Sequence, residues 1–269
     1  MQVLQSNGVY IHYRRETTGA VDAGETTLVF ANSLGTDLRL WDRMVAELPG
    51  GFDVVRYDKR GHGLSDAPAP PYSIEDHADD LAGLLDGLGI GKAVICGISV
   101  GGMIAMSLAL RRPERVQGLV LMDTGHKIGN AEGWAQRIAT VEADCIGALA
   151  DTVIQGWLSD AFRTERPGET AAWRNLLART PSVAGYAGTC AALRDADLTE
   201  QIGAIRVPAL CLCGAQDAST PPQLMRELRD LLPAARYEEV AGTKHLPCIE
   251  EPKAISDHIV GLIEEATRD

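Results

Sequence analysis

Two hydrophobic patterns alternate along most of the chain. One is a short, nearly continuous apolar run, typical of a strand that is buried on both faces of a parallel sheet. The other has apolar residues three or four positions apart, as on the buried face of a helix. The runs lie at residues 27–31, 53–58, 93–98, 116–122 and 207–214, and the helical segments lie at 38–48, 73–88, 103–112, 222–232 and 252–263. A further short strand is expected at 235–240. This alternation predicts the α/β class, with a mostly parallel central sheet and helices on both of its faces.

The first 30 residues depart from this alternation. Residues 9–13 alternate between apolar and polar side chains, and turn residues follow at 17–19 and 22–24. The chain is therefore predicted to open with antiparallel strands before the buried strand at 27–31.

A second departure begins where the strand at 116–122 ends. From 124 to 201 there is no strand pattern, helical patterns dominate, and the segment holds three of the four tryptophans. We expect a core of residues 1–123 and 202–269, interrupted by a helical lid at 124–201 that covers the strand ends. Aromatic side chains of such a lid can line a pocket, although we expect at least one tryptophan to fill the lid's own interior.

The bulk composition narrows the function classes. A chain of 269 residues with 45% hydrophobic residues can bury a large core. Its 25 basic and 37 acidic residues give a net charge of −12, which disfavours nucleic acids and anionic membranes as partners. No apolar run approaches the roughly 20 residues that span a bilayer, and the first residues lack the regions of a secretory signal. We therefore expect a cytoplasmic protein.

The six cysteines are scattered along the chain. Their spacing matches neither a disulfide framework nor the paired ligands of a zinc site. We expect reduced, mostly buried thiols, and we expect no metal site.

The strand at 93–98 runs directly into Gly97-Ile98-Ser99-Val100-Gly101. This Gly-x-Ser-x-Gly pattern is typical of a nucleophile elbow, a sharp strand-to-helix turn that lifts one hydroxyl clear of the sheet edge. The helix that follows points its N-terminal N–H groups at the same place. Ser99 is therefore the candidate nucleophile. A dinucleotide fingerprint is disfavoured, because it requires glycine at the position that Ser99 occupies.

A serine hydrolase of this fold carries its acid and its base after the serine, in that order along the chain. Asp217 follows the strand at 207–214, and His245 lies in the loop after the next strand. All three side chains therefore lie at the carboxyl edge of the sheet and can converge. His245 is the candidate base, and Asp217 is the candidate acid that orients it. Asp123, which also ends a strand, is an alternative acid.

Other histidines and one cysteine are weaker candidates. A structural role in a turn is favoured for His62, and a surface or capping role is favoured for His126. His77 and His258 lie on helical segments and are expected to face solvent. Cys248 lacks an elbow of its own and is expected to pack in the interior.

An oxyanion hole needs two N–H donors. One is expected from Val100, the residue after the nucleophile, and the other from the loop after the strand at 27–31. In that loop Leu34 is the preferred donor and Ser33 the alternative.

Five segments together resemble the 3-oxoadipate enol-lactonases of the α/β-hydrolase fold. The resemblance extends over nearly the whole chain, from about Val9 to Pro252. Two departures from that family's pattern are Val100, where leucine is expected, and the polar residues at 123–126, and both concern the shape of the pocket. The matching segments are Ala31–Asp37 with Trp41, Tyr57–Asp66, Cys96–Met103, Gly185–Leu198 and His245–Pro252.

The resemblance implies hydrolysis of a small anionic lactone. The substrate would be a five-membered enol-lactone with a carboxymethyl group, which opens to 3-oxoadipate in aromatic catabolism. The resemblance implies no metal and no organic cofactor. Four lid residues are pocket candidates: Trp134 and Trp157 as aromatic lining, and Arg137 and Arg194 as cations for the substrate carboxylate. Solvation or pairing with Asp195 or Glu142 is an equal alternative for the arginines.

Other functions stay open on the sequence alone. The same triad serves broad carboxylesterases and cofactor-free perhydrolases. A slow-turnover ligand receptor on a hydrolase scaffold is an alternative of another class. Haloalkane dehalogenation is disfavoured, because its nucleophile is a carboxylate and position 99 is serine.

Overall fold

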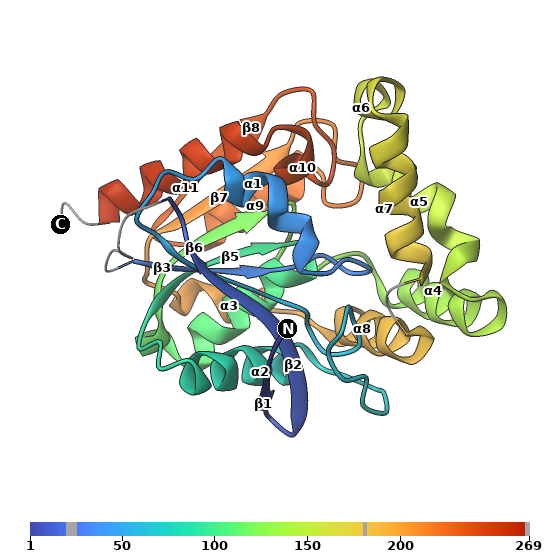
Figure 1. Ribbon diagram of the computed structural model, residues 1–269, viewed down its shortest axis with the longest axis horizontal. Helices are drawn as coiled ribbons and strands as arrows, with labels where there is room; N and C mark the ends of the chain where they lie inside the picture. Colours follow the sequence, from blue (N-terminus) through green and yellow to red (C-terminus); the bar gives the residue numbers. More distant parts are fainter. Residues whose placement is uncertain (20–25, 180–181, 267–269) are drawn as a thin grey trace.

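The structure of the protein is a computed structural model that describes residues 1–19, 26–179 and 182–266. A central sheet runs through its core (Figure 1). The turn expected at 22–24 lies outside the described residues. The described strands form one eight-stranded sheet in the order β1-β2-β4-β3-β5-β6-β7-β8. Their bounds are β1 (Gln2–Ser6), β2 (Val9–Thr17), β3 (Thr27–Ala31), β4 (Asp53–Tyr57), β5 (Ala93–Ile98), β6 (Val116–Met122), β7 (Ala209–Gly214) and β8 (Ala235–Val240).

The strand directions confirm the predicted class. The strands from β4 to β8 are parallel, and β2 pairs antiparallel with both β1 and β4. Four of the parallel strands, β3, β4, β5 and β7, are buried at every position, as their continuous apolar runs predict. All parallel strands point toward the same edge of the sheet, so the loops that leave their carboxyl ends gather there.

Helices cover both faces of the sheet. On one face α1 (Asp42–Ala46) contacts α11 (Pro252–Ala266), and on the other α2 (Ile74–Gly87) packs on α3 (Val100–Arg111) (Figure 1). The helix α9 (Pro222–Leu231) contacts β7 and β8. Ser73 caps α2 in a reciprocal capping box with Asp76, which fixes where this helix begins.

A helical insertion, residues 124–201, lies beyond the carboxyl ends of the strands. Its described residues contain no strand, in agreement with the sequence pattern. In Figure 1 these helices form a group at one side of the core. They are α4 (Ala131–Asp144), α5 (Ala150–Trp157), α6 (Asp160–Glu165), α7 (Pro167–Arg179) and α8 (Val183–Asp195), with the 3-10 turn η3 (Ile146–Leu149) between α4 and α5.

Three elements differ from the expectation. The strand β1 was not predicted, because its residues are mostly polar and it lies at the sheet edge. The helix expected at 38–48 is broken into the 3-10 turn η1 (Leu38–Trp41) and the short α1. A short helix, α10 (Pro247–Glu250), follows His245 directly. None of the described helices is long and apolar enough to cross a membrane.

Candidate active site

Ser99 occupies a strained turn between β5 and α3. Its backbone has φ 57°, in the left-handed region that non-glycine residues rarely adopt. The two flanking glycines make the turn possible, because no side chain fits at either. A Cβ atom on Gly97 would lie 2.2 Å from the carbonyl oxygen of Gly101, and one on Gly101 would lie 2.1 Å from that of Ala31. The sequence therefore places one hydroxyl at a fixed point of the sheet edge, at a cost in strain.

His245 and Asp217 are joined by a hydrogen bond at the same edge. His245 Nδ1 lies 2.8 Å from Asp217 Oδ2, and both residues are nearly fully buried. The backbone N–H of Ser219 and the hydroxyl of Thr220 also donate to the Asp217 carboxylate. Burial alone would raise the pKa of Asp217, but His245 and these donors lower it overall. An ionised Asp217 fixes the His245 tautomer, with the proton on Nδ1 and Nε2 unprotonated.

The alternative acid, Asp123, lies next to this pair. Side-chain ligand atoms of Asp123, Asp217 and His245 all lie within 4.8 Å of one another. However, Asp123 Oδ1 accepts a hydrogen bond from the backbone N–H of Gly214. Burial and the neighbouring Asp217 carboxylate raise the pKa of Asp123 well above its usual range. The surroundings of Asp123 therefore disfavour its charged form, and the carboxylate that is hydrogen-bonded to His245 belongs to Asp217.

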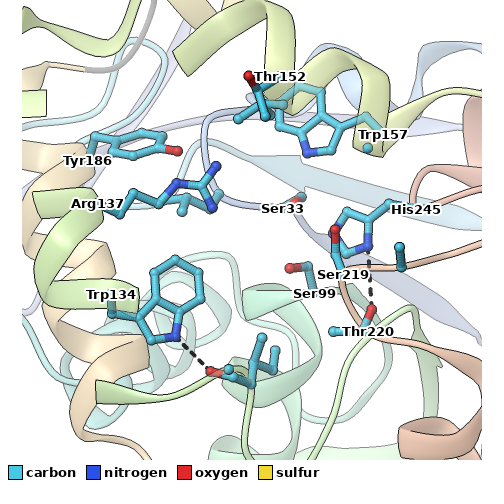
Figure 2. Close-up of a pocket in the computed structure, with 16 residues that line it drawn as sticks. Ser33, Ser99, Trp134, Arg137, Thr152, Trp157, Tyr186, Ser219, Thr220 and His245 are labelled. Carbon is cyan, nitrogen blue, oxygen red and sulfur yellow. Dashed lines mark hydrogen bonds between the residues drawn. The ribbon is translucent and has the colours of Figure 1, made fainter. Parts of the chain in front are cut away.

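A cavity of about 410 Å³ opens between the sheet edge and the helical insertion (Figure 2). Ser99 and His245 border it from the sheet side. Among the described residues no hydrogen bond joins Ser99 Oγ to His245, a gap common in unliganded hydrolases that closes when substrate binds. Side chains of the insertion border the opposite side. The lining residues include Ser33, Leu34, Ser99, Trp134, Arg137, Thr152, Trp157, Tyr186, Ser219, Thr220 and His245.

Both expected oxyanion donors lie beside Ser99. Leu34 borders the cavity, as does Ser33, and Val100 is the first residue of α3. Because the first N–H groups of a helix have no carbonyl one turn back, the N–H of Val100 is available to a ligand. The Ser33 carbonyl oxygen accepts hydrogen bonds from the N–H and the hydroxyl of Thr36, which hold this loop in a turn.

Two further histidines lie in the interior. His62 Nε2 accepts a hydrogen bond from the Gly35 N–H at 3.0 Å, which ties the turn after β4 to the loop that holds Leu34. Burial lowers the pKa of both His62 and His77 well below the usual range, so each stays neutral. The expectation that His77 faces solvent is wrong. It is 1% exposed, because its face of α2 packs against Thr189 of α8.

Arg137 of α4 enters the cavity from the side opposite His245 (Figure 2). Its guanidinium lies 5.6 Å from the ring centre of Trp134 and 5.9 Å from that of Tyr186. No carboxylate pairs with it among the described residues. Tyr186 is a lining residue that our sequence reasoning did not single out, although it lies in the segment 185–198 that carries the family resemblance. The site thus holds one cation framed by two aromatic rings.

The other pocket candidates separate into two groups. Trp157 and Trp134 both border the cavity. Trp157 lies near His245, and Trp134 lies on the opposite side (Figure 2). Arg194 does not border the cavity, because its guanidinium donates to the Asp195 carboxylate at 2.8 and 2.7 Å. Trp173 also lies away from the cavity, in a separate hollow. The other residues that line this hollow are Arg39, Asp42, Arg43, Glu169, Ala172, Asn175, Leu176 and Arg179.

The cysteines take no part in this site. Among the described residues all six are unpaired, and five of them are buried. Cys248, three positions after His245, is fully buried, and burial raises the pKa of its thiol far above the ordinary value. A thiol in that state is a poor nucleophile.

Comparison with known proteins places this geometry in a family. The alpha/beta hydrolase fold family matches residues 26–139 and 156–252. The chain is 34% identical to 3-oxoadipate enol-lactonase 2 of Acinetobacter baylyi, over 97% of this chain and 96% of that protein. It is 29% identical to a pimeloyl-acyl-carrier-protein methyl ester esterase of Neisseria meningitidis, over 86% and 76% of the two chains.

Among solved structures, the enol-lactonase from Burkholderia xenovorans LB400 superposes with a TM-score of 0.93 at 36% identity. The match covers 98% of this chain and all of that one, so the helical insertion is part of it. The sheet, the elbow and the sequence likeness therefore agree, and the chain belongs to the alpha/beta hydrolase fold family, in the group of the 3-oxoadipate enol-lactonases.

Proposed function

We propose that this protein is a serine hydrolase that opens the 3-oxoadipate enol-lactone ring. One observation carries the proposal beyond a general ester hydrolase. Arg137, a cation without a carboxylate partner among the described residues, faces Ser99 and His245 across a cavity of about 410 Å³. A small lactone with a carboxylate on its side chain fits such a site. Relatives named enol-lactonases support the same assignment.

In the proposed acylation step, Ser99 Oγ attacks the lactone carbonyl while His245 Nε2 takes its proton. Asp217 stabilises the imidazolium that forms. The negative charge that develops on the carbonyl oxygen is stabilised by the N–H groups of Leu34 and Val100. The ring carbon–oxygen bond then breaks, and the leaving group is an enolate. Because an enolate is a better leaving group than an alkoxide, the proton that His245 returns is less critical here than in ester cleavage.

The leaving group stays tethered to the acyl-enzyme and would reclose the ring if it kept its nucleophilic oxygen. Conversion of the enol to the ketone removes that nucleophile. Water, deprotonated by His245, then attacks the acyl carbon, and Ser99 leaves with the proton. The product is the open 3-oxoadipate, and no step needs a metal or an organic cofactor.

We also propose that residues 124–201 act as a lid and that Arg137 binds the substrate carboxylate. The guanidinium is a bidentate donor that suits a carboxylate. Trp134 and Tyr186 hold it in place through ring contacts. Trp157 gives the lactone ring an apolar wall beside His245.

Removal of the Arg137 charge tests this subsite. We expect Arg137→Met to raise KM for the anionic lactone about 10- to 100-fold, since a charge-assisted hydrogen-bond pair is worth about 1.5–3 kcal/mol. Hydrolysis of a neutral aryl acetate should change little. Arg194→Met is the matched control, because Arg194 is a lid arginine that pairs with Asp195 outside the cavity. Equal effects of the two substitutions on KM would remove Arg137 from the subsite.

A substrate panel tests the assignment as a whole. Purified protein is assayed on the enol-lactone generated in situ, on the methyl ester of that lactone and on aryl acetates. We expect the highest kcat/KM for the free-acid lactone. If the protein cleaves aryl acetates but leaves the lactone intact, the substrate assignment fails and the hydrolase assignment stands.

A broad carboxylesterase is the second candidate. It is favoured by the esterase relative of Neisseria meningitidis, whose name describes cleavage of a methyl ester. In that case the neutral substrates of the same panel would be turned over at least as well as the anionic lactone, and Arg137→Met would not change their order.

A further inference from the structure

Lys59 is a fully buried lysine that takes no part in the proposed acylation and deacylation steps. It follows Asp58 in the turn after β4 and is 1% exposed. Its ammonium has no carboxylate within ion-pair distance among the described residues. Because a buried charge without a partner is expensive, a lysine in this place needs a reason.

The ammonium of Lys59 is bound to the loop that supplies the second oxyanion donor. Nζ donates to the carbonyl oxygen of Ser33 at 2.6 Å and is 3.4 Å from that of Thr36. The same Ser33 oxygen accepts from the hydroxyl of Thr36 at 2.9 Å and from its N–H at 3.3 Å. Three donors therefore converge on one carbonyl, and the only cation among them is Lys59.

That carbonyl belongs to the same peptide group as the N–H of Leu34. In a trans peptide the C=O and the N–H point in opposite directions, and the cis bond of the described residues lies elsewhere, at Pro70-Pro71. A cation fixed on the Ser33 oxygen therefore orients the Leu34 N–H away from Lys59, and Leu34 is a residue that borders the cavity. It also withdraws electron density from the peptide group, which strengthens the N–H as a donor.

We infer that Lys59 is a positioning residue of the oxyanion hole, which orients and polarises the Ser33–Leu34 peptide from behind. The inference rests on the proposed function, in which the N–H of Leu34 stabilises the oxyanion. It assigns the buried charge a role in the transition state: the ammonium stabilises the negative charge on the substrate oxygen through one intervening peptide.

The surroundings of Lys59 make its charge sensitive to pH. Burial lowers the pKa of its ammonium to about 7, and the Asp58 and Asp37 carboxylates act in the opposite direction. The other titratable groups that interact with it, His62 and His77, stay neutral. As the pH rises through about 7, Lys59 loses its charge but keeps a neutral amine that still donates. The kcat of the wild type should therefore fall partly on the alkaline side, by less than the loss caused by removal of the side-chain nitrogen.

The test compares Lys59→Met, which keeps the length of the side chain but has no donor or charge, with the wild type. Aryl acetate and enol-lactone are both used as substrates. We expect kcat to fall about 10- to 100-fold with KM changed less than about threefold, because loss of a whole oxyanion donor costs about 10²–10³-fold. Ser256→Ala, which removes another buried hydrogen bond to a backbone carbonyl, far from the site, is the control and should leave kcat unchanged.

Inhibitor binding separates positioning from a general loss of structure. An arylboronic acid forms a tetrahedral anion on Ser99 and needs the oxyanion hole, whereas the product 3-oxoadipate does not. In Lys59→Met the boronate affinity should fall in parallel with kcat, the product affinity should stay within about threefold, and the partial alkaline fall of kcat should disappear. If Lys59→Met does not fold, Lys59→Gln keeps a donor without the charge and should give an intermediate loss.

Unchanged kcat in the folded variant would overturn the inference, as would equal losses of boronate and product affinity. These outcomes differ from failure of the proposed function. A wild type that cleaves aryl acetate but not the lactone loses only the substrate assignment, and the Lys59 test proceeds on the ester. A wild type inert toward both substrates would refute the serine hydrolase and the Lys59 role together.

Discussion

Asp217 and Asp123 each have a carboxyl oxygen within 4.8 Å of His245, and their surroundings shift their pKa values in opposite directions. Asp217 receives hydrogen bonds from the N–H of Ser219 and the hydroxyl of Thr220 in addition to His245. Asp123 accepts one hydrogen bond, from the backbone N–H of Gly214. It is fully buried and lies close to the negative charge of Asp217, and both raise its pKa. The sequence favoured Asp217 from its order along the chain and kept Asp123 as an alternative, since both end strands at the same edge. The contacts around the two carboxyl groups show which one is hydrogen-bonded to His245.

Asparagine substitutions test which carboxyl group is the acid. Asp217→Asn should lower kcat about 10⁴-fold, because an amide cannot stabilise the imidazolium of His245 and favours the wrong tautomer. Asp123→Asn is the matched control and should keep kcat within about tenfold, because the hydrogen bond to His245 comes from Asp217 and Asp123 accepts from the Gly214 N–H instead. Steady-state kinetics on one ester substrate is sufficient. The reverse order of the two losses would assign the acid to Asp123.

The raised pKa of Asp123 also has a consequence for stability. Its pKa is higher in the folded protein than the ordinary value of about 3.9 in the unfolded chain. As the pH rises from about 4, the unfolded chain therefore releases this proton first, and the free energy of unfolding falls. Asp123→Asn lacks this term, so its stability relative to the wild type should increase with pH. Urea unfolding of both proteins at pH 5 and pH 8 measures the change. A constant difference would show that Asp123 is ionised in the folded state.

At the scale of elements, the elbow, the triad strands and the acid and base loops follow from local patterns. The strands β5, β6 and β8 occur at the predicted residues, and β5 and β6 are apolar runs bounded by turn residues or charged residues. The contact of α8 with the turn after β4 could not be predicted. It depends on two glycines far apart in the sequence, Gly61 and Gly185, whose backbones touch. A Cβ atom on Gly61 would lie 2.4 Å from the Cα atom of Gly185.

Gly61→Ala should therefore displace α8. This displacement should also move the ring of Tyr186, a residue of α8 that borders the cavity. The matched control is Gly89→Ala, which has a similar φ of +66° but nothing within 4 Å of the added Cβ atom. In the control, alanine must adopt the left-handed backbone conformation, which lowers the free energy of unfolding by about 1–2 kcal/mol. This loss corresponds to a fall in Tm of roughly 2–8 °C. Gly61→Ala should lower Tm further and raise KM for the lactone. Equal Tm values for the two variants would show that the contact between the turn and α8 adds no stability.

At the scale of the molecule, the sequence predicted the fold class, because it depends on the order of apolar periodicities along the chain. Of the four insertion residues named as pocket candidates, three border the cavity and Arg194 does not. Arg137 and Arg194 have equal charge and similar sequence settings, and only the orientation of α4 and α8 separates them. The role we infer for Lys59 likewise needs the coordinates, since a lysine among polar turn residues is ordinarily exposed.

If Ser99 opens a small anionic enol-lactone, the protein should remove the ultraviolet absorbance of that lactone when the lactone is generated in situ. The wild type should remove the absorbance with multiple turnovers per protein molecule, and Ser99→Ala should remove it no faster than a reaction without protein. Persistence of the lactone with the wild type, or its equally fast loss with Ser99→Ala, would show that Ser99 does not open this ring.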